Sequence, residues 1–258
     1  AVGADPDRVA LLDNFCFGSP EREDVMGSIV LACQACYDIA LTYKTPFISG
    51  KDSLYNEYID PDGNPRPILP TLLVSSLGFL DVKDVVTMDL KDEDNLIYLI
   101  GITREELGGS EYYYQMGIED GFVPGLDPEV GMKVYKDLNK AIREGIIRSC
   151  HDLSEGGLGT AIAEMVIAGR IGATIDITSI GYEGQRRPDL ILFSESNSRF
   201  LLEVDPRDED QLLKLLRDLP IFKIGKTGGD RLDIKFNHQT VLSIPISTLE
   251  KTWKRKPI

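Results

Sequence analysis

Two short polar segments of the chain combine the residue types that phosphate binding needs, and each follows an apolar segment. The first is residues 49–53, Ser-Gly-Lys-Asp-Ser. Gly50 lets the backbone approach a ligand without a side-chain clash, Lys51 supplies a mobile cation, and Asp52 can reach a bound Mg²⁺ ion. Because Gly-Lys pairs are common, an ordinary turn with solvated charges is the alternative interpretation.

The second polar segment is residues 151–158, His-Asp-Leu-Ser-Glu-Gly-Gly-Leu. A predicted strand over 146–150 delivers His151 and Asp152, and the glycine pair then opens a helix whose bare N–H groups could bind an anion. In the alternative interpretation Ser154 is only an N-cap and His151 is a structural histidine. The concentration of ionisable residues and glycines within a few positions favours a functional site.

Two further positions could contribute to a site. The polar segment 194–199 separates apolar segments over 190–193 and 199–204, which we predict as strands. Such a connection is usually solvated, but here it could line a cleft. Asp13 ends a predicted strand over 8–12, where the carboxyl end of the strand would present ligands.

Cys33 and Cys36 have the spacing of a redox or zinc pair. They also share one face of a predicted helix with Met26, Ile29 and Ala40, where buried thiols act as small apolar residues. No second pair of this spacing and no nearby histidine completes a zinc site. The pattern therefore favours reduced cysteines, which are typical of the cytoplasm, over a metal or redox pair.

The composition excludes some classes of protein. The 258 residues carry a formal net charge of −14, whereas nucleic-acid binders need a basic footprint. Anionic ligands are not excluded, because backbone N–H groups and bound Mg²⁺ can hold phosphates. We find no signal-peptide pattern at the start and no apolar run approaching the ~20 residues that cross a bilayer. We therefore predict a cytoplasmic protein with no membrane and no nucleic-acid partner.

Strands and helices alternate along the chain, but tight turns join several strands, which favours an α+β class of α/β sandwiches over one doubly wound sheet. The charged segment 89–95 is typical of a contact-poor linker. We therefore predict two domains, residues 1–91 and 92–258. Among the predicted helices are 24–44, 128–143 and 207–218. The sequence contains neither a Walker loop nor a strand–GxGxxG–helix unit.

Five segments, taken in order, carry a family resemblance: DNFCFGSPE (13–21), TPFISGKDSLYNE (45–57), LGGSE (107–111), HDLSEGGL (151–158) and FSESNSR (193–199). Together they resemble the C-terminal half of phosphoribosylformylglycinamidine synthase, the synthetase subunit of purine biosynthesis. The resemblance covers essentially the whole chain. It implies a barrel-forming N-terminal domain like that of aminoimidazole-ribonucleotide synthetase, followed by a C-terminal α/β domain.

The resemblance also implies a reaction. ATP phosphorylates the amide oxygen of formylglycinamide ribonucleotide, and ammonia displaces the phosphate to form the amidine, a phosphoryl transfer that depends on Mg²⁺ and positioning. The implied partners are the N-terminal half of the enzyme, a glutaminase subunit that supplies ammonia, and a small accessory subunit. The family's catalytic histidines belong to the missing half, so we expect no catalytic residue here and no turnover by this half alone.

Individual residues match the family's positions. Asp13 and Gly50 match ATP-contacting positions, and Ser53 matches a substrate-contacting serine. Lys51 stands where some members carry a metal-binding asparagine. Because a charged lysine cannot bind Mg²⁺, we assign Lys51 to a phosphate of ATP instead.

A second group of residues resembles counterparts from the other half of the family's enzymes. Asp152 and the loop Glu195, Ser196 and Asn197 correspond to metal and substrate residues of that half, at a second site where large members hold a structural nucleotide. We expect ATP or ADP with Mg²⁺ between the two domains. Carboxylates there are useful only if Mg²⁺ lies between them and the phosphates.

Two functions and an assembly state remain as hypotheses. The chain is either half of an active ligase or a noncatalytic nucleotide-binding module that stabilises an assembly. A free-standing selenophosphate, thiamine-phosphate or hydrogenase-maturation enzyme is disfavoured by the segment Ser-Leu-Tyr-Asn-Glu after Gly-Lys-Asp. We also expect a homodimer through strands 9–12 and 72–80, because an unpaired apolar sheet edge invites a second copy.

Overall fold

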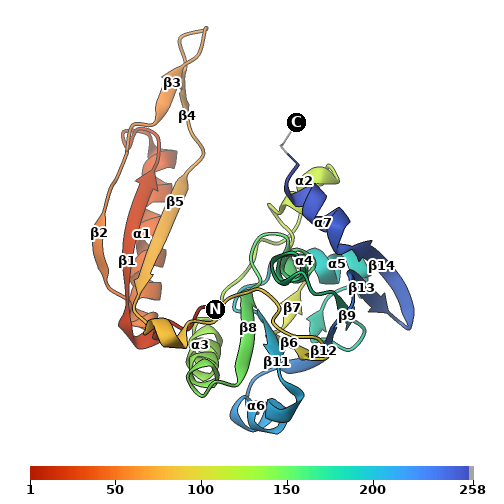
Figure 1. Ribbon diagram of the computed structural model, residues 1–258. Helices are drawn as coiled ribbons and strands as arrows, with labels where there is room; N and C mark the ends of the chain where they lie inside the picture. Colours follow the sequence, from red (N-terminus) through yellow and green to blue (C-terminus); the bar gives the residue numbers. More distant parts are fainter. Residues whose placement is uncertain (256–258) are drawn as a thin grey trace. The chain divides into compact units, whose positions relative to one another are not determined.

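The computed structural model describes residues 1–255 and contains two compact units (Figure 1). One unit is Ala4–Leu80, and the other is Ala1–Gly3 together with the chain from Asp81 onward. Each unit combines a sheet with helices, so the predicted α+β class is confirmed. The domain boundary between residues 91 and 92 stays a prediction, and positions 256–258 of the predicted second domain lie outside the described residues.

A three-stranded sheet with the order β2-β1-β5 forms the first unit. Strand β1 pairs parallel with β2 and antiparallel with β5. Helix α1 connects β1 to β2, and a short hairpin of β3 and β4 precedes β5. The elements are η1 (Pro6–Arg8), β1 (Val9–Cys16), α1 (Glu23–Tyr43), β2 (Phe47–Gly50), β3 (Glu57–Ile59), β4 (Pro65–Pro67) and β5 (Thr71–Gly78).

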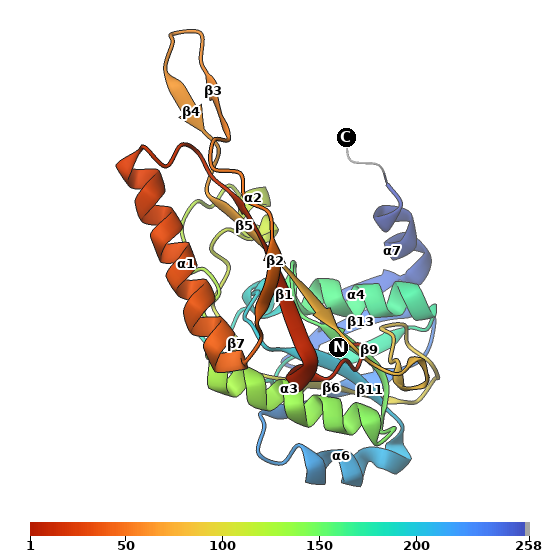
Figure 2. The same cartoon turned by 90° about the vertical axis from the view of Figure 1, so that its left-hand side faces the viewer.

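Helix α1 lies along this sheet and packs one side against it (Figure 2). Val25 and Ile29 contact a small apolar cluster around Phe15 and Phe17. The helix ends before Lys44, whose φ of 56° is left-handed and closes the last turn. The helix predicted over 24–44 is therefore confirmed.

The two cysteines of the predicted helical face have different surroundings. Cys36 packs toward the sheet, and burial raises the pKa of its thiol. Cys33 and Met26 are exposed, so the face that packs is offset from the predicted one. Both cysteines are free thiols.

Helix α1 is also the most apolar long segment of the chain. It has 21 residues, and a window of 18 residues within it has a mean hydropathy of 1.5, enough by length and composition to cross a membrane. The sequence-based statement that no segment approaches this length is therefore wrong. It counted uninterrupted apolar residues, whereas the helix interleaves them with small and uncharged polar ones. Core helices of soluble proteins that pass the same test are mostly buried, whereas 6% of this window is buried. One such helix by itself assigns α1 no membrane role.

A seven-stranded sheet with the order β14-β13-β9-β12-β6-β11-β8 forms the second unit. Its paired neighbours are antiparallel, except for the parallel pair of β9 and β13. Its strands are β6 (Leu96–Ile100), β8 (Ile147–Asp152), β9 (Ala173–Asp176), β11 (Phe200–Val204), β12 (Ile221–Thr227), β13 (Arg231–Phe236) and β14 (Gln239–Pro245). A separate two-stranded sheet pairs β7 (Thr103–Arg104) in parallel with β10 (Tyr182–Glu183). The helices are η2 (Val82–Asp84), α2 (Glu111–Gln115), α3 (Pro128–Arg143), α4 (Gly157–Gly169), α5 (Pro188–Phe193), η3 (Pro206–Asp208), α6 (Glu209–Leu215) and α7 (Ile246–Trp253).

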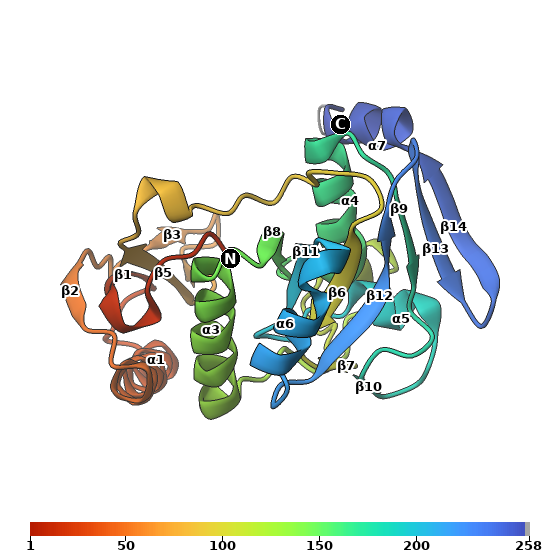
Figure 3. The same cartoon turned by 60° about the horizontal axis from the view of Figure 1, so that its bottom comes forward.

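Strand β6, in the interior of this sheet, is buried on both faces. Its Ile97 and Leu99 join the core under α4 and α5, whereas Leu96, Tyr98 and Ile100 join the core under α3 and α6. Figure 3 shows α3 and α6 on one side of the sheet and α4 on the other. A strand covered by helices on both faces needs a continuous apolar run rather than an alternating one, and all five β6 residues are buried.

One predicted strand is wrong, because residues 190–193 belong to helix α5. A four-residue apolar run fits a buried strand and a buried helix equally well. Pro188 occupies the first turn of α5, where its fixed φ favours a helix. The helix predicted over 128–143 is confirmed as α3, and the one over 207–218 is the shorter α6.

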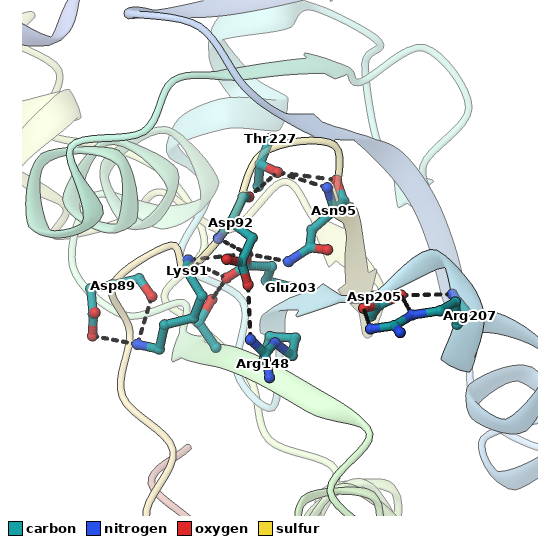
Figure 4. Close-up of polar contacts among 10 residues, drawn as sticks. Asp89, Lys91, Asp92, Asn95, Arg148, Glu203, Asp205, Arg207 and Thr227 are labelled. Atoms are coloured by element: carbon teal, nitrogen blue, oxygen red, sulfur yellow. Dashed lines mark hydrogen bonds and ion pairs between the residues drawn. The ribbon is translucent and has the colours of Figure 1, made fainter.

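A buried carboxylate, Glu203 of β11, organises one end of the second unit (Figure 4). It accepts hydrogen bonds from the backbone N–H groups of Lys91 (2.9 Å) and Asp92 (3.1 Å). The side chains of Asn95 (2.7 Å) and Ser149 (2.8 Å) also donate to it. A buried charge is tolerated when its lone pairs are satisfied in this way.

The segment 89–95 is therefore not the contact-poor linker that its charge suggested. Thr227 holds the segment as well, since its Oγ1 donates to the Asp92 carbonyl (2.7 Å) and accepts from the Asn95 N–H group (2.9 Å). The Arg148 guanidinium donates to the Asp92 carboxylate at 2.8 Å. The backbone of the segment is held by internal hydrogen bonds, while the side chains of Asp92, Glu93 and Asp94 remain exposed.

We predict that Glu203→Gln lowers the free energy of unfolding by about 2–4 kcal/mol, because several buried donors lose a charged acceptor. The control is Glu183→Gln, which removes an exposed ion pair with Arg104 and should cost about 0–1 kcal/mol. Urea unfolding followed by circular dichroism measures both values. Equal effects of the two substitutions would contradict the role given to Glu203.

Candidate functional site

Asp13 and Gly50 face each other on neighbouring strands of the first unit. They are paired in the parallel register of β1 and β2. Asp13 lies inside β1, which continues to Cys16, so the prediction that Asp13 ends its strand is wrong. A Cβ atom on Gly50 would lie 2.2 Å from Asp13 Oδ1. Position 50 therefore has no room for a side chain, because the aspartate occupies that space.

The loop after Gly50 is fixed to β1. The Lys51 N–H group donates to the Asp13 carbonyl at 3.0 Å, and the Ser53 N–H group donates to the Phe15 carbonyl at 2.7 Å. The Asp52 carboxylate accepts from the Phe15 N–H group at 3.4 Å. The Lys51 ammonium donates to the Ser53 hydroxyl. Four of the sequence-predicted residues, Asp13, Gly50, Lys51 and Ser53, are thus brought together.

The second group of predicted residues lines a pocket of about 370 Å³ in the other unit. Asp152 is the last residue of β8 and pairs with Phe200 at the start of β11, which places it beside Glu195 and Asn197 on the pocket wall. Ser196 is fully buried, and its hydroxyl accepts from the Arg104 N–H group at 2.8 Å. It does not line the pocket.

Arg199 forms the base of this pocket and holds the loop 194–199. It is 1% exposed, and its guanidinium donates to the carbonyls of Ser194 (2.6 Å) and Ser196 (2.8 Å) and to the Thr103 hydroxyl (2.9 Å). Burial lowers the pKa of Arg199 to about 10, against the opposing charges of Glu106 and Glu195. The guanidinium stays charged at neutral pH and fixes the loop from below.

The glycine pair before α4 is explained by packing. Gly156 and Gly157 both have positive φ, of 77° and 58°, and a Cβ atom on Gly157 would lie 2.2 Å from the Ser194 carbonyl oxygen. The Gly156 N–H group donates to Glu195 Oε1 at 2.8 Å. The sequence suggested that the N–H groups at the helix start are free to bind an anion. The Gly156 N–H group instead donates to the Glu195 carboxylate. Ser154 provides no side-chain cap.

His151 does not line the pocket, although the sequence pointed to it. Its Nε2 lies 2.7 Å from Glu164 Oε2 on α4, and its Nδ1 lies 3.4 Å from Asp152 Oδ1. The hydrogen bond with Asp152 raises the pKa of His151, with a further contribution from Glu164. The same hydrogen bond lowers the pKa of Asp152, so this carboxyl is ionised at neutral pH.

The pocket walls offer oxygen ligands for a hard cation. They carry the carboxylates of Asp152, Glu155 and Glu195 and the amide of Asn197, and such oxygens are the ligands that Mg²⁺ prefers. Within residues 1–255, however, no group of three or more His, Cys, Asp or Glu side chains is placed to hold a metal ion. A metal at Asp152 would need ligands from elsewhere, such as phosphate oxygens or water.

Sequence reasoning missed Glu106, which lies behind the pocket loop. It is 9% exposed, and its Oε1 accepts from the Gly125 N–H group at 2.9 Å. Its Oε2 is buried and has no hydrogen-bond partner among the described residues. The available signal was an acidic residue directly before the apolar Leu107 and the glycine pair, a position where a solvated carboxylate would not be expected.

Comparisons with known proteins match both units. Residues 92–236 match the family model "AIR synthase related protein, C-terminal domain". The PurL subunit of phosphoribosylformylglycinamidine synthase from Thermococcus sibiricus is 34% identical over 257 residues, which cover 100% of this chain and 35% of that protein. PurL of Methanocaldococcus jannaschii is 35% identical, over 98% of this chain and 34% of that protein. The chain therefore spans about a third of the length of these relatives.

Solved structures support the same fold. PurLQS from Thermotoga maritima matches with a TM-score of 0.73 at 17% identity, over 97% of this chain and 39% of that chain. PurL from T. maritima complexed with FGAR matches with a TM-score of 0.74 at 17% identity, over 96% of this chain and 40% of that chain. PurL complexed with ATP matches with a TM-score of 0.67 at 16% identity, over 96% and 38%.

We predict that Glu164→Gln reduces the pH dependence of stability. Because the folded pKa of His151 is raised, its protonation stabilises the fold below the unfolded histidine pKa of about 6.5, and this contribution is lost as pH rises through the folded value. Without the Glu164 carboxylate, the stability difference between acidic and alkaline buffer should shrink. Urea unfolding between pH 5.5 and 8.5 measures it, with Glu144→Gln as the exposed control. An unchanged pH profile would contradict the assignment.

Proposed function

Because this chain belongs to the AIR synthase related protein family, we propose that it forms the nucleotide-binding half of a larger ATP-dependent ligase of purine biosynthesis. The proposed reaction converts formylglycinamide ribonucleotide, ATP and ammonia to formylglycinamidine ribonucleotide, ADP and phosphate. The observation that carries the proposal is the pocket where β8 ends and β11 begins, which Asp152, Glu195 and Asn197 line together. The T. maritima PurL complexes with ATP and FGAR support it.

Each unit would contribute different contacts. In the first unit, Asp13, Gly50 and Lys51 would contact ATP and Ser53 would contact the substrate. Lys51 and Ser53 already share a hydrogen bond, so an ammonium and a hydroxyl are available together for a phosphate or ribose oxygen. Because position 50 has no side chain, the Asp13 carboxylate fills the space beside it, and this contact would hold the carboxylate in position.

In the second unit, Asp152 would hold Mg²⁺, with Glu195 and Asn197 on the same wall and Ser196 fixing the loop from inside. A bound Mg²⁺ would neutralise phosphate charge that the pocket's carboxylates would otherwise repel. His151 holds Asp152 in its ionised form through the hydrogen bond between them. The chain supplies positioning, and we propose that the turnover depends on groups from the other half.

One observation favours the alternative of a noncatalytic nucleotide-binding module. Both ring nitrogens of His151 form hydrogen bonds with carboxylates, those of Asp152 and Glu164. Neither nitrogen is therefore free to bind a substrate. Turnover by the purified chain alone with ATP, ammonia and substrate would exclude both the module and the half-enzyme.

The proposed partners are the N-terminal half of the enzyme, a glutaminase subunit and a small accessory subunit, and the T. maritima PurLQS structure supports an assembly of this kind. For the isolated chain we propose a homodimer through the first unit. Strand β5 is an edge of the β2-β1-β5 sheet, and its Leu73, Val74 and Leu77 are exposed. Such an edge is a template for pairing with another chain.

We predict that Asp152→Asn weakens binding of ATP with Mg²⁺ by about 1–3 kcal/mol, the scale of a lost charged partner, or about 5–150-fold in Kd. Binding by the wild type should require Mg²⁺. Isothermal titration calorimetry with and without Mg²⁺ measures both effects, with the exposed Asp230→Asn as the matched control. Equal affinity of the wild type and Asp152→Asn would remove Asp152 from the site. No binding by the wild type would instead favour a site that the other half completes.

We predict that the chain dimerises and that Leu73→Lys abolishes the dimer, because the substitution places a charge on the exposed edge strand. The control is Leu69→Lys, at a residue that is 85% exposed just before β5. Light scattering coupled to size-exclusion chromatography over a range of concentrations gives the mass of each variant. A strict monomer of the wild type at the highest concentration would refute the dimer.

A further inference from the structure

The irregular segment between α2 and α3 reaches the wall of the Asp152 pocket, which its Pro124 helps to line. Residues 116–127 form neither helix nor strand. Phe122 and Val123 of this segment are 79% and 71% exposed, so the burial of these side chains does not hold it. Hydrogen bonds to neighbouring segments hold it instead.

The backbone of Gly125 in this segment is hydrogen-bonded on both sides. Its N–H group donates to Glu106 Oε1 at 2.9 Å, and its carbonyl oxygen accepts from Asn197 Nδ2 at 2.9 Å. Glu106 is buried behind the pocket loop, whereas Asn197 lines the pocket. Gly125 therefore connects a buried carboxylate to a side chain of the pocket wall.

Glu106 is a fixed acceptor. Its backbone N–H group donates to the Arg104 carbonyl at 2.8 Å, and its own carbonyl accepts from the Glu195 N–H group at 3.0 Å. Its carboxylate also interacts electrostatically with the buried Arg199 guanidinium. A carboxylate held in this way keeps the Gly125 N–H group in one place.

Asn197, in contrast, is exposed, and exposed side chains exchange rotamers within nanoseconds unless a partner holds them. The partner is the Gly125 carbonyl oxygen. Because a carbonyl oxygen needs a donor, this contact places Nδ2 toward Gly125 and leaves Oδ1 on the other side of the amide. Among residues 1–255 no group donates to Asn197 Oδ1. The amide oxygen is thus the atom that remains available to a ligand.

We propose that Glu106 is a positioning residue of the Asp152 pocket, which orients Asn197 through the Gly125 peptide so that the amide oxygen is presented to the ligand. An oxygen acceptor binds an electropositive group, either a hydroxyl donor or Mg²⁺. The opposite orientation would present an NH₂ group, which repels both. The effect on ligand binding rests on the proposed function, whereas the orientation of Asn197 does not.

The first experiment needs no ligand and measures the heteronuclear NOE of asparagine side-chain amides in the full chain. In the wild type, the Asn197 amide should be as rigid as the backbone, and the amide of Asn237, exposed in the turn between β13 and β14, is the mobile reference. In Glu106→Met, the Asn197 amide should become as mobile as that of Asn237. Methionine fills the space of glutamate but offers no oxygen acceptor to Gly125.

The matched control is Glu106→Gln, because glutamine keeps an oxygen acceptor for the Gly125 N–H group and loses only the charge. Both substitutions should lower the midpoint of thermal unfolding, since each removes the counter-charge of Arg199. Only Glu106→Met should release the Asn197 side chain. The pair therefore separates positioning from a general loss of stability.

The second experiment is isothermal titration calorimetry with ATP and Mg²⁺. Glu106→Met should raise Kd about 2–10-fold, the scale of one lost hydrogen bond, and Glu106→Gln should keep the wild-type Kd. In an Asn197→Ala background, Glu106→Met should cause no further loss, because the side chain that it positions is already gone. Titration with adenosine, which has hydroxyls but no phosphate to bring Mg²⁺, distinguishes a hydroxyl contact from a metal contact.

The NOE measurement decides the orientation by itself. A wild-type Asn197 amide as mobile as that of Asn237, or an equally rigid one in folded Glu106→Met, would overturn the proposal. A loss of ATP affinity that persists in the Asn197→Ala background would also overturn it, because Glu106 would then act by another route. Absence of ATP binding by the wild type would count against the proposed nucleotide site alone.

Discussion

The buried carboxylate of Glu203 is the constraint on which the second unit depends. It lies in the seven-stranded sheet of the second unit, on a strand with helices on both faces, and it accepts hydrogen bonds from two other parts of the chain. Without it, the backbone N–H groups of Lys91 and Asp92 would have no acceptor in that position. The chain entering β6 is therefore placed by a charge on β11, and both strands contribute side chains to the two cores of the unit.

A second buried charge, the Arg199 guanidinium, holds neighbouring segments at the other end of β11. Arg199 precedes β11 and binds three oxygen atoms of neighbouring segments, just as Glu203 near the end of β11 binds N–H and hydroxyl donors. One charge is a donor of several hydrogen bonds, and the other is an acceptor of several. Strand β11 thus fixes a loop at each end, and the loop at the Arg199 end carries Glu195 and Asn197 of the candidate site.

The sequence predicted much of the fold where one property dominates. The helices α1 and α3 were predicted from long segments with apolar residues spaced three and four apart, and β11 was predicted from the apolar segment 199–204. It failed at residues 190–193, where a four-residue apolar run does not distinguish strand from helix, and at 89–95, where charge suggested solvent. Charge alone does not reveal a buried partner more than 100 positions away, as Glu203 is for Lys91.

The candidate site was predictable in its residue types and not in its geometry. The groups containing Asp13 and Asp152 were found from polar segments beside predicted strands and from the family resemblance, and each group is assembled within its own unit. Two details are visible only in the three-dimensional structure. Asp13 lies inside its strand, and the Ser196 side chain is buried in the protein. Glu106 was missed because its role depends on two contacts that the sequence does not reveal. It accepts a hydrogen bond from the Gly125 N–H group, and its charge acts on the buried Arg199.

The glycine pair at 156–157 changes how its motif can be used as a diagnostic. Gly157 is required because the Ser194 carbonyl oxygen takes the space of a side chain, and Gly156 because its φ is positive. These demands come from the packing of α4 against the loop before β11, whether or not any ligand is bound. A distant homologue that had lost nucleotide binding would still need both glycines for this packing. The glycine pair in a sequence therefore indicates this contact between helix and loop, and it does not indicate activity.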